Sequence, residues 1–471
     1  MPAVVDEDDE LLLVLLLTCL QLNKEVKEAA DAFVRQQKRL NGRRPKQKNR
    51  PTWHSFLQRV SPQHFRRMFR MPIASFEKLC DDICAVVSQE VFRPEAFLSH
   101  GGLSERPTSL ALQHQGGYIP GEIKSAISLR MLAGGSYLDM VPLFDVVKSQ
   151  VYEAFDTFIR WVIRTYRFPL VCWLRNDDCD RLHQLASDFG EKTGGVLCGC
   201  FGAIDGIAMR IQSPKLRDVS DPGNCCCRKG FCALNVQAIC DKKKRFLWVN
   251  PMNKGSAHDS TAFNNCKLWD LLCEKNDRLV GEGLHLDGDS AYPLTGFLQV
   301  PCELPDLQSD PTRSLDAFNC YHSANRIYIE CAFGEFVMRW GIFWRALRFD
   351  LKKCGMIIQA AMLLHNFIID ERHGNPHDDF DRNCFSNFRI DGNQQSQQRL
   401  TQATGEQPRA LVTDNNEPRP AGRPSNQDAE HRRQGQRIRN SNLLKLAHHN
   451  FQRPILSNMR LNAQGHVHMD C

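Results

Sequence analysis

One stretch decides the fold of this chain: Gly195-Val-Leu-Cys-Gly-Cys-Phe-Gly-Ala-Ile-Asp205-Gly-Ile-Ala-Met-Arg-Ile211. Its apolar residues run to Asp205 between glycines, which is typical of a strand buried on both faces of a sheet. We expect this strand to end at Asp205, followed by a turn at Gly206 and a further strand up to Ile211. A strand end is a rigid position for a metal ligand or a general base. The alternative for a lone aspartate here is a turn residue that bonds its own backbone.

A second segment, from Gly283 to Pro293, repeats this arrangement. Its apolar residues lead to Asp289, and Pro293 then closes the element because proline cannot continue a hydrogen-bonded ladder. Asp287 lies on the same strand face and is the rival for the same role. We prefer Asp289 because it comes at the end of the strand, where a metal ion can reach it.

The third carboxylate comes from a segment with helical spacing. Between Phe318 and Trp340, apolar residues recur as in an amphipathic helix. Arg326 and Glu330 are four residues apart and share one face of this helix; alone, such a pair is more often a solvated ion pair. Carboxylates from two strand ends and a helix form a small oxygen-ligand cage of the kind that suits Mg²⁺ or Mn²⁺. Its members are Asp205, Asp289 and Glu330.

Five motifs follow one another in an order that is more specific than any one of them. They are Gly202-x-Ile204-Asp205-Gly206; Arg228-Lys229-Gly230 with Asn235 and Gln237; Gly255-Ser256-x-His258-Asp259-Ser260; Gly288-Asp289-Ser290-x-Tyr292-Pro293; and Asn319-x2-His322-Ser323-x2-Arg326-x2-Ile329-Glu330-x2-Phe333-Gly334. From about Arg67 to Asn366 the chain resembles the PIF/Harbinger transposases of the DDE superfamily and, equally, the vertebrate Harbinger-derived nucleases. It departs from the family's usual pattern where Ile207-Ala208 replace Thr-His and Cys227 replaces Asn.

This resemblance implies a DNA nuclease and transposase-like recombinase with an RNase H-like fold. Asp205, Asp289 and Glu330 would be the catalytic triad and the metal ligands. Two divalent ions, Mg²⁺ or Mn²⁺, would serve to cut a DNA phosphodiester and, in strand transfer, to join one. The family also implies a separately encoded Myb-like partner that helps with nuclear entry and end recognition, and hence a location in the nucleus and also the cytoplasm.

Further polar residues of the motifs are candidates for DNA contacts or for positioning the carboxylates. The segment 232–239 alternates like a strand, a charged turn follows, and 246–249 is a further strand. A helix begins near His258, and an apolar helix over 356–369 carries His365 and Asn366 in structural roles. The candidates are Arg228, Lys229, Asn235, Gln237, His258, Asp259 and Arg326.

The region before the nuclease segment is helical throughout. Helices over 122–133 and 136–144, a glycine turn between them and a longer helix that starts at Lys148 have the outline of a helix-turn-helix. An ordinary helical bundle is the alternative. The resemblance favours DNA binding, in which four side chains would face the groove or the phosphates: Lys148, Ser149, Gln150 and Tyr152.

These patterns predict an α/β chain in four parts: residues 1–50, an N-terminal helix and basic linker; 51–171, a helix-turn-helix-like domain; 172–372, an RNase H-like domain with a mixed sheet; and 373–471, a disordered polar tail. The basic cluster at 43–50 is of the nuclear-import type, with a DNA-backbone contact or a solvated linker as alternatives. Arginines between 432 and 439 are candidates for a nonspecific nucleic-acid tether.

Composition narrows the protein class. The 471 residues are 42% hydrophobic with a net charge of +6, which allows a sizeable core and a polyanionic partner. The apolar run Leu11–Leu17 is shorter than the roughly 20 residues of a membrane span. The 20 cysteines show no paired CxxC motifs, so we expect reduced thiols rather than a disulfide scaffold or zinc finger.

Two rival functions remain. One is a domesticated, non-catalytic DNA-binding or chromatin-associated protein that retains the fold; the complete triad argues against it. The other is a metal-dependent RNase or a different RNase H-like hydrolase, which would lack the preceding helix-turn-helix. The sequence leaves open whether the chain forms a homo-oligomer.

Overall fold

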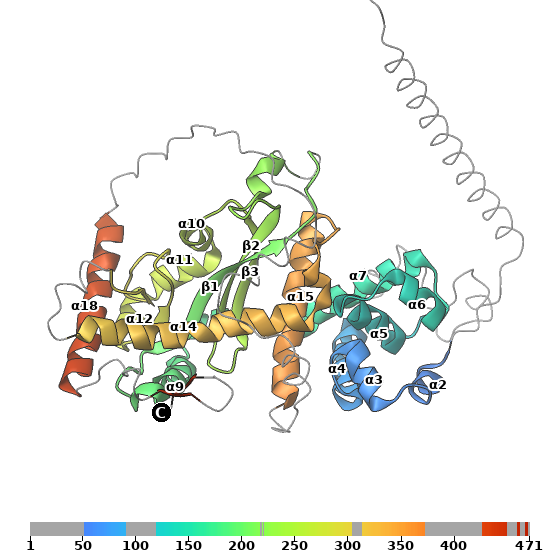
Figure 1. Cartoon of the computed structure of the whole chain (residues 1–471), viewed down its shortest axis with the longest axis horizontal. Coiled ribbons are helices and arrows are strands. Elements are labelled where there is room, and N and C mark those ends of the chain that lie inside the picture. Colours follow the sequence, from blue (N-terminus) through green and yellow to red (C-terminus); the bar gives the residue numbers. More distant parts are fainter. Residues whose placement is uncertain are drawn as a thin grey trace, which may run out of the picture.

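The centre of the molecule is a five-stranded mixed sheet with the strand order β3-β2-β1-β4-β5 (Figure 1). The computed structural model describes residues 51–90, 119–216, 219, 221–303, 313–372, 426–449, 459–461 and 467–469. β1 pairs antiparallel with β2 and parallel with β4, so the two kinds of pairing meet at β1. The strands are β1 (Cys200–Arg210), β2 (Ala233–Cys240), β3 (Phe246–Lys254), β4 (His285–Asp287) and β5 (Leu298–Gln299).

β1 is one continuous strand, so the predicted turn at Gly206 is wrong. Every residue from Ala203 to Arg210 pairs with β2. A glycine is required within this ladder, because a β-carbon at Gly206 would lie 2.2 Å from Asp259 Oδ1 and 2.4 Å from Gln237 Nε2. Gly206 therefore marks the close approach of two side chains, and Asp205 lies inside β1 rather than at its end.

Helices cover both faces of the sheet. On one face, β1 and β2 share an apolar core with α14 (Ser314–Arg339) and α15 (Leu351–Arg372), and Figure 1 shows α14 running across the sheet. On the other face, Ile204, Ile239 and Trp248 belong to a second core. The helices of that second layer are α8 (Leu170–Arg175), α9 (Cys179–Gly190), α10 (Asp259–Asn264), α11 (Lys267–Glu274) and α12 (Asn276–Gly281).

Most of the elements predicted for this region form. The helix expected over 318–340 is α14, that over 356–369 lies within α15, and the strands 232–239 and 246–249 correspond to β2 and β3. The structural role expected for Asn366 is confirmed: its side chain accepts from the backbone N–H of Phe246 at 2.8 Å and donates to the Phe246 carbonyl at 2.7 Å. His365 Nε2 lies 3.1 Å from the Lys244 carbonyl. These bonds fix α15 to the start of β3.

Six helices of the described ranges precede α8. α5, α6 and α7 begin and end within one residue of the positions that the helix-turn-helix outline predicted, and Ser136 caps α6 because its hydroxyl accepts the Leu138 N–H at 3.2 Å. The ring of Phe155 in α7 lies 5.9 Å from that of Phe349, just before α15, so these helices share one apolar core with the sheet. They are α2 (Trp53–Leu57), α3 (Pro62–Phe69), α4 (Ile73–Glu90), α5 (Gly121–Leu132), α6 (Tyr137–Phe144) and α7 (Lys148–Thr165).

The tail predicted to be disordered contains a long helix, so that prediction is wrong for residues 426–448. α18 (Asn426–His448) packs on α14 and β5. Leu446 is fully buried in a small core with Phe318, and Arg439 Nη2 donates to the Val300 carbonyl at 2.6 Å. The sequence of α18 contains few apolar residues, and polar side chains make much of its contact with the rest of the protein. β6 (Met459–Leu461) and β7 (Val467–Met469) form a separate antiparallel pair.

Three other predictions concern the terminal segments, the cysteines and membrane-spanning helices. The N-terminal segment 1–50 with its basic cluster, and the tail residues 373–425, lie outside the described residues. The cysteines of the described ranges form no disulfide in the structure, and the expectation of reduced thiols stays a prediction. In the described part of the chain, no helix combines the length and the apolar character that crossing a membrane requires.

Candidate active site

Asp205 lies in β1, and Asp289 lies just beyond the neighbouring parallel strand β4. β1 and β4 pair in the register that places Ala203 opposite Asp287. Asp205 follows Ala203 by two residues and Asp289 follows Asp287 by two, and the two carboxylates are close enough for Asp289 to raise the pKa of Asp205. Asp289 lies just beyond β4, as predicted, and its Oδ1 accepts the Ala291 N–H at 3.0 Å.

Asp205 is a largely buried acid among other charges. Its side chain is 19% exposed, and Arg326 Nη2 lies 3.5 Å from its Oδ2. Burial raises the pKa of Asp205 from 3.8 to about 6; the Gly206 N–H and Arg326 lower it, whereas Asp289 and Asp259 raise it. Burial also raises the pKa of Asp241, in the turn between β2 and β3, to about 6. The convergence of acids from separate segments, rather than the pKa, therefore distinguishes Asp205.

α14 brings the third carboxylate to this point. Arg326 Nη2 lies 3.5 Å from Glu330 Oε1, one helical turn away, and the Arg326 side chain is only 16% exposed. The pairing predicted from the spacing is confirmed, with Arg326 largely buried and Glu330 more than half exposed. The guanidinium of Arg326 instead lies between the carboxylates of Asp205 and Glu330.

The donor set suits a hard divalent cation, although the predicted cage is not assembled. Within the described residues, no three His, Cys, Asp or Glu side chains are placed to hold a metal ion. Asp205 and Glu330 both lie next to the guanidinium of Arg326. The Arg326 side chain would have to move away before both carboxylates could bind a cation. Glu330 is 57% exposed and Asp289 is half-buried, so the site is open to solvent. Three carboxylates in such a position fit Mg²⁺ or Mn²⁺ chemically.

Asp287, the rival of Asp289, is enclosed. Its residue is 3% exposed, its Oδ2 accepts the side-chain N–H of Asn325 at 3.0 Å, and His322 Nε2 lies 3.8 Å from its Oδ1. Burial lowers the pKa of His322, which favours the neutral ring. Asp287 therefore joins β4 to α14 and is buried rather than exposed at the site. Sequence reasoning missed Asn325, which directly precedes Arg326 and differs from it in helical face.

A hydrogen-bonded network fixes Asp259 beside Gly206. Asp259 Oδ1 accepts from Asn235 Nδ2 at 3.0 Å and from Gln237 Nε2 at 2.7 Å. The Tyr292 hydroxyl donates to Gln237 Oε1 at 2.5 Å, and burial raises the pKa of Tyr292, which keeps it a donor. Asn235 and Gln237 of β2 thus act together with Asp259 of α10. Tyr292 belongs to one of the five motifs, but nothing in its spacing marks it as their partner.

A hollow of about 310 Å³ opens beside this network, and Asn235 and Asp259 form part of its lining. Arg228, Lys229 and His258 line it, and the Arg228 guanidinium contacts the His258 ring. The structure therefore brings these three candidates together at one opening beside Gly206. The residues that depart from the family pattern, Ile207, Ala208 and Cys227, line the same hollow.

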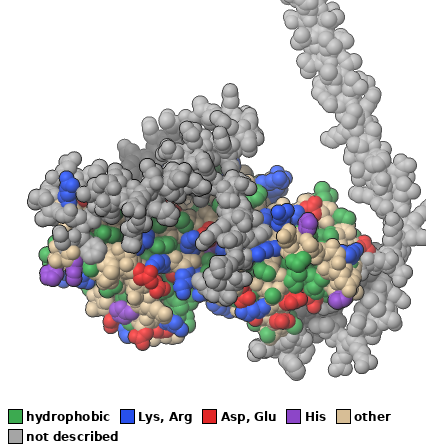
Figure 2. Space-filling view, turned by 60° about the horizontal axis from the view of Figure 1, so that its bottom comes forward, with side chains coloured by type: hydrophobic (Ala, Val, Ile, Leu, Met, Phe, Trp, Pro, Cys, Tyr) green, Lys and Arg blue, Asp and Glu red, His purple; other side chains and the backbone are tan. Residues whose placement is uncertain are grey.

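The four candidates of the helix-turn-helix outline lie at the start of α7, but they differ in exposure. Ser149 is exposed, and Lys148 lies over the Tyr137 ring at 4.8 Å. Gln150 Oε1 accepts the Val147 N–H at 3.1 Å, and Tyr152 packs near Tyr137. Gln150 and Tyr152 thus serve the local fold. On the face drawn in Figure 2, Lys and Arg side chains are interspersed with acidic ones and form no single basic patch among the described atoms.

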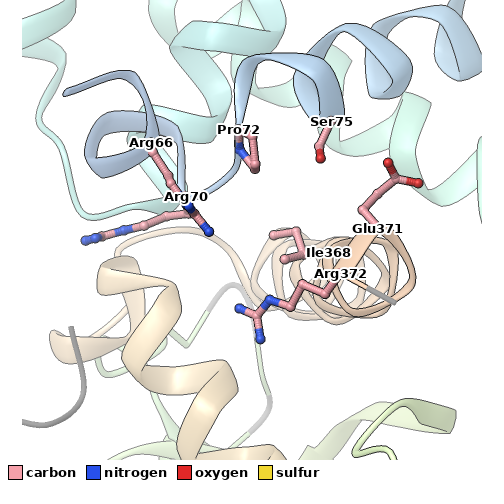
Figure 3. Close-up of a pocket in the computed structure, with 7 residues that line it drawn as sticks. All are labelled: Arg66, Arg70, Pro72, Ser75, Ile368, Glu371 and Arg372. Carbon is pink, nitrogen blue, oxygen red and sulfur yellow. The ribbon is translucent and has the colours of Figure 1, made fainter. Parts of the chain in front are cut away.

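A second, smaller hollow lies away from the acids. Figure 3 shows it between α3, α4 and the end of α15, with Arg66, Arg70 and Arg372 around it. Burial and the neighbouring Arg339 lower the pKa of Arg372 to about 9. None of the three carboxylates lines this hollow.

Residues 204–366 match the family model described as DDE superfamily endonuclease. The chain is also similar to a mouse (Mus musculus) protein named "Putative nuclease HARBI1", with 27% identity over 179 residues, which cover 37% of this chain and 47% of that protein. The match therefore spans about half the length of this curated relative. No solved structure matches the chain. The similarity that the five motifs indicated is confirmed, and a DDE endonuclease domain is RNase H-like.

Proposed function

We propose, from the match of residues 204–366 to the DDE superfamily endonucleases, that this chain is a metal-dependent DNA endonuclease of the PIF/Harbinger type. One observation carries the proposal. Asp205 in β1 and Asp289 just beyond the parallel neighbour β4 are close enough to interact electrostatically, and α14 carries Glu330, which shares the guanidinium of Arg326 with Asp205. Three acids distant in sequence, from β1, from just beyond β4 and from α14, thus lie around one solvent-accessible region, which supports the proposal.

Asp205, Asp289 and Glu330 would hold Mg²⁺ or Mn²⁺. When bound, such ions supply Lewis-acid stabilisation of the phosphate and an activated water or 3′-hydroxyl. The raised pKa of Asp205 means that its carboxylate must lose a proton before it can act as a ligand. Arg326 would leave the carboxylates and balance the negative charge of a phosphate instead. Arg228 and Lys229 would hold the DNA backbone at the neighbouring hollow.

The wider role follows from the same family. We propose that the chain also joins DNA ends, binds DNA through the α5–α7 region, works with a Myb-like partner and acts in the nucleus. Ser149 and Lys148 at the start of α7 are the exposed side chains that suit a phosphate contact.

A second candidate function rests on Arg326. Its guanidinium occupies the space between Asp205 and Glu330 and neutralises them, as it would in a non-catalytic DNA-binding protein that keeps the fold. The two candidates differ in whether a divalent cation can displace this side chain.

The experiment is cleavage of supercoiled plasmid by the purified full-length chain, because nicking at any sequence is then detected. We expect nicking with Mg²⁺ or Mn²⁺, none with EDTA, and a loss of at least about 100-fold in Asp205→Asn, Asp289→Asn and Glu330→Gln with DNA binding retained. Asp241→Asn is the matched control, since Asp241 is buried and has a similarly raised pKa but lies in a hairpin turn. Nicking that survives in Asp205→Asn would remove Asp205 from the site.

A further inference from the structure

A large groove lies between α18 and the segment 290–303. Its volume is about 1020 Å³. One wall is α18, which contributes Arg432, Arg433 and Gln436; the opposite side includes Ser290 and Tyr292. α10 and α11 close the groove, the latter with Trp269. This groove is separate from the hollow that Arg228 and Lys229 line, because the two share no lining residue.

The α18 wall is fixed to the body of the protein. Gln434 Oε1 accepts from Asn276 Nδ2 at 2.5 Å, and Gln299 Nε2 donates to the Gly435 carbonyl at 3.3 Å. A β-carbon at Gly435 would lie 2.7 Å from the Thr295 carbonyl oxygen, so the helix backbone lies directly against the segment that forms the other wall. These contacts hold Arg432 and Arg433 at a set position beside the groove.

The lining has the character of a nucleic-acid site. Among its residues are three arginines and a single carboxylate, that of Glu303. Arg432 and Arg433 are exposed; Arg433 also pairs with Glu430 at 3.1 Å, outside the groove. An aromatic ring, Trp269, is present with the arginines. Basic groups that follow a backbone, combined with rings on which bases stack, are the means by which proteins bind single strands.

The groove also leads to the acidic site. Ser290 directly follows Asp289, and Tyr292 donates its hydroxyl hydrogen bond to Gln237, which in turn holds Asp259. A strand whose phosphate reaches Asp289 would therefore continue past Ser290 into the groove.

We propose that the groove between α18 and residues 290–303 binds a single strand of DNA adjacent to the phosphate that the acidic site cuts. This proposal rests on the proposed nuclease function for its location, but binding can be measured without cleavage. Residues 426–448, in a tail whose sequence suggests disorder, would then form part of the substrate site.

The test is fluorescence anisotropy of a labelled single-stranded oligonucleotide of about 12 nucleotides, with the full-length protein in EDTA over a range of salt concentrations. Arg432→Gln/Arg433→Gln removes both groove charges. Arg437→Gln is the matched control, because Arg437 is exposed on the same helix and does not line the groove. We expect the double variant to bind at least about tenfold more weakly and its salt slope to fall by about 1.4, since each lost phosphate contact in a single strand accounts for about 0.7.

The control should change affinity less than about twofold, a small effect for an exposed charge outside the site. The proposal would be overturned if the double variant and the control lost affinity equally, or if the double variant lost none. It would also be overturned if the double variant lost affinity only for duplex DNA. If the wild type binds as expected but never cuts plasmid, the nuclease proposal fails and the groove stands. If it cuts and the double variant binds normally, the groove proposal alone fails.

Discussion

The guanidinium of Arg326 lies 3.5 Å from a carboxylate oxygen of Asp205. These residues are far apart in the sequence, and α14 brings them together above β1. The same guanidinium reaches Glu330, so one positive charge holds two of the acids that would bind a metal ion. Arg326 therefore controls both the charge of Asp205 and access to it.

Arg326→Gln should move the acid limb of the cleavage rate to higher pH. Arg326 lowers the pKa of Asp205, so its loss raises that pKa further and a higher pH is needed to form the carboxylate. Arg326→Lys keeps the charge and should shift the limb less. A rate profile from pH 5 to pH 9 measures this, and an acid limb that is the same in all three proteins would contradict it.

Asp205→Asn should stabilise the fold above pH 6. Burial raises the pKa of Asp205 from 3.8 to about 6, so the folded state holds its proton more tightly than the unfolded state does. The folded state has this stabilisation in full below pH 3.8 and loses it as the pH rises to about 6. The loss in unfolding free energy is about 3 kcal/mol, the free energy that corresponds to a pKa shift of this size. Asn avoids that cost.

Urea unfolding in EDTA at several pH values from 4 to 8 measures this effect. The stability gap between Asp205→Asn and the wild type should widen between pH 4 and pH 6 and stay constant above. A gap that narrows with rising pH would show that Asp205 is not buried in this way.

Gly206→Ala should damage the site. The added β-carbon would lie 2.2 Å from Asp259 Oδ1 and 2.4 Å from Gln237 Nε2, and both side chains are held in a network with little room to move. We expect a cost of about 1–3 kcal/mol in unfolding free energy and a larger loss of cleavage. Gly334→Ala is the control, because a β-carbon at Gly334 on α14 would have no atom of another residue within 4 Å beyond its own helical turn; it should be neutral or stabilising. Equal effects of the two changes would contradict the described packing.

Much of the site was predictable because it depends on local pattern. Apolar residues leading to an aspartate located β1 and β4, and helical spacing located α14 with Arg326 and Glu330 on one face. Gly206 misled the prediction, since a glycine in an apolar run indicates a turn, whereas here it admits Asp259 and Gln237 from other segments. Contacts between segments, such as that of Tyr292 with Gln237, leave no periodic signal in the sequence.

α18 was missed for a related reason. Its docking uses Gln434, Arg439 and the backbone of Gly435, residue types whose abundance in the tail indicates disorder when composition is considered alone. The metal cage was predicted from carboxylates expected at two strand ends and on a helix, and the position of the Arg326 guanidinium between two of its members could not be inferred from spacing.

Leu446→Ala should cost about 2–5 kcal/mol of unfolding free energy, because its side chain is fully buried beside Phe318. Leu444→Ala, two residues earlier on α18, should cost almost nothing, since Leu444 is 72% exposed. Chemical denaturation of both variants provides the comparison. Equal stabilities would mean that α18 does not dock on the body of the protein.

The central claim is that Asp205, Asp289 and Glu330 together bind a divalent cation, and the most direct test is Mn²⁺ binding followed by electron paramagnetic resonance with DNA present. We predict that the wild type and Asp241→Asn bind Mn²⁺ alike, whereas Asp205→Asn, Asp289→Asn and Glu330→Gln each bind it at least about tenfold more weakly, as expected when one of a few carboxylate ligands is lost. Equal Mn²⁺ binding by all five proteins would contradict the claim.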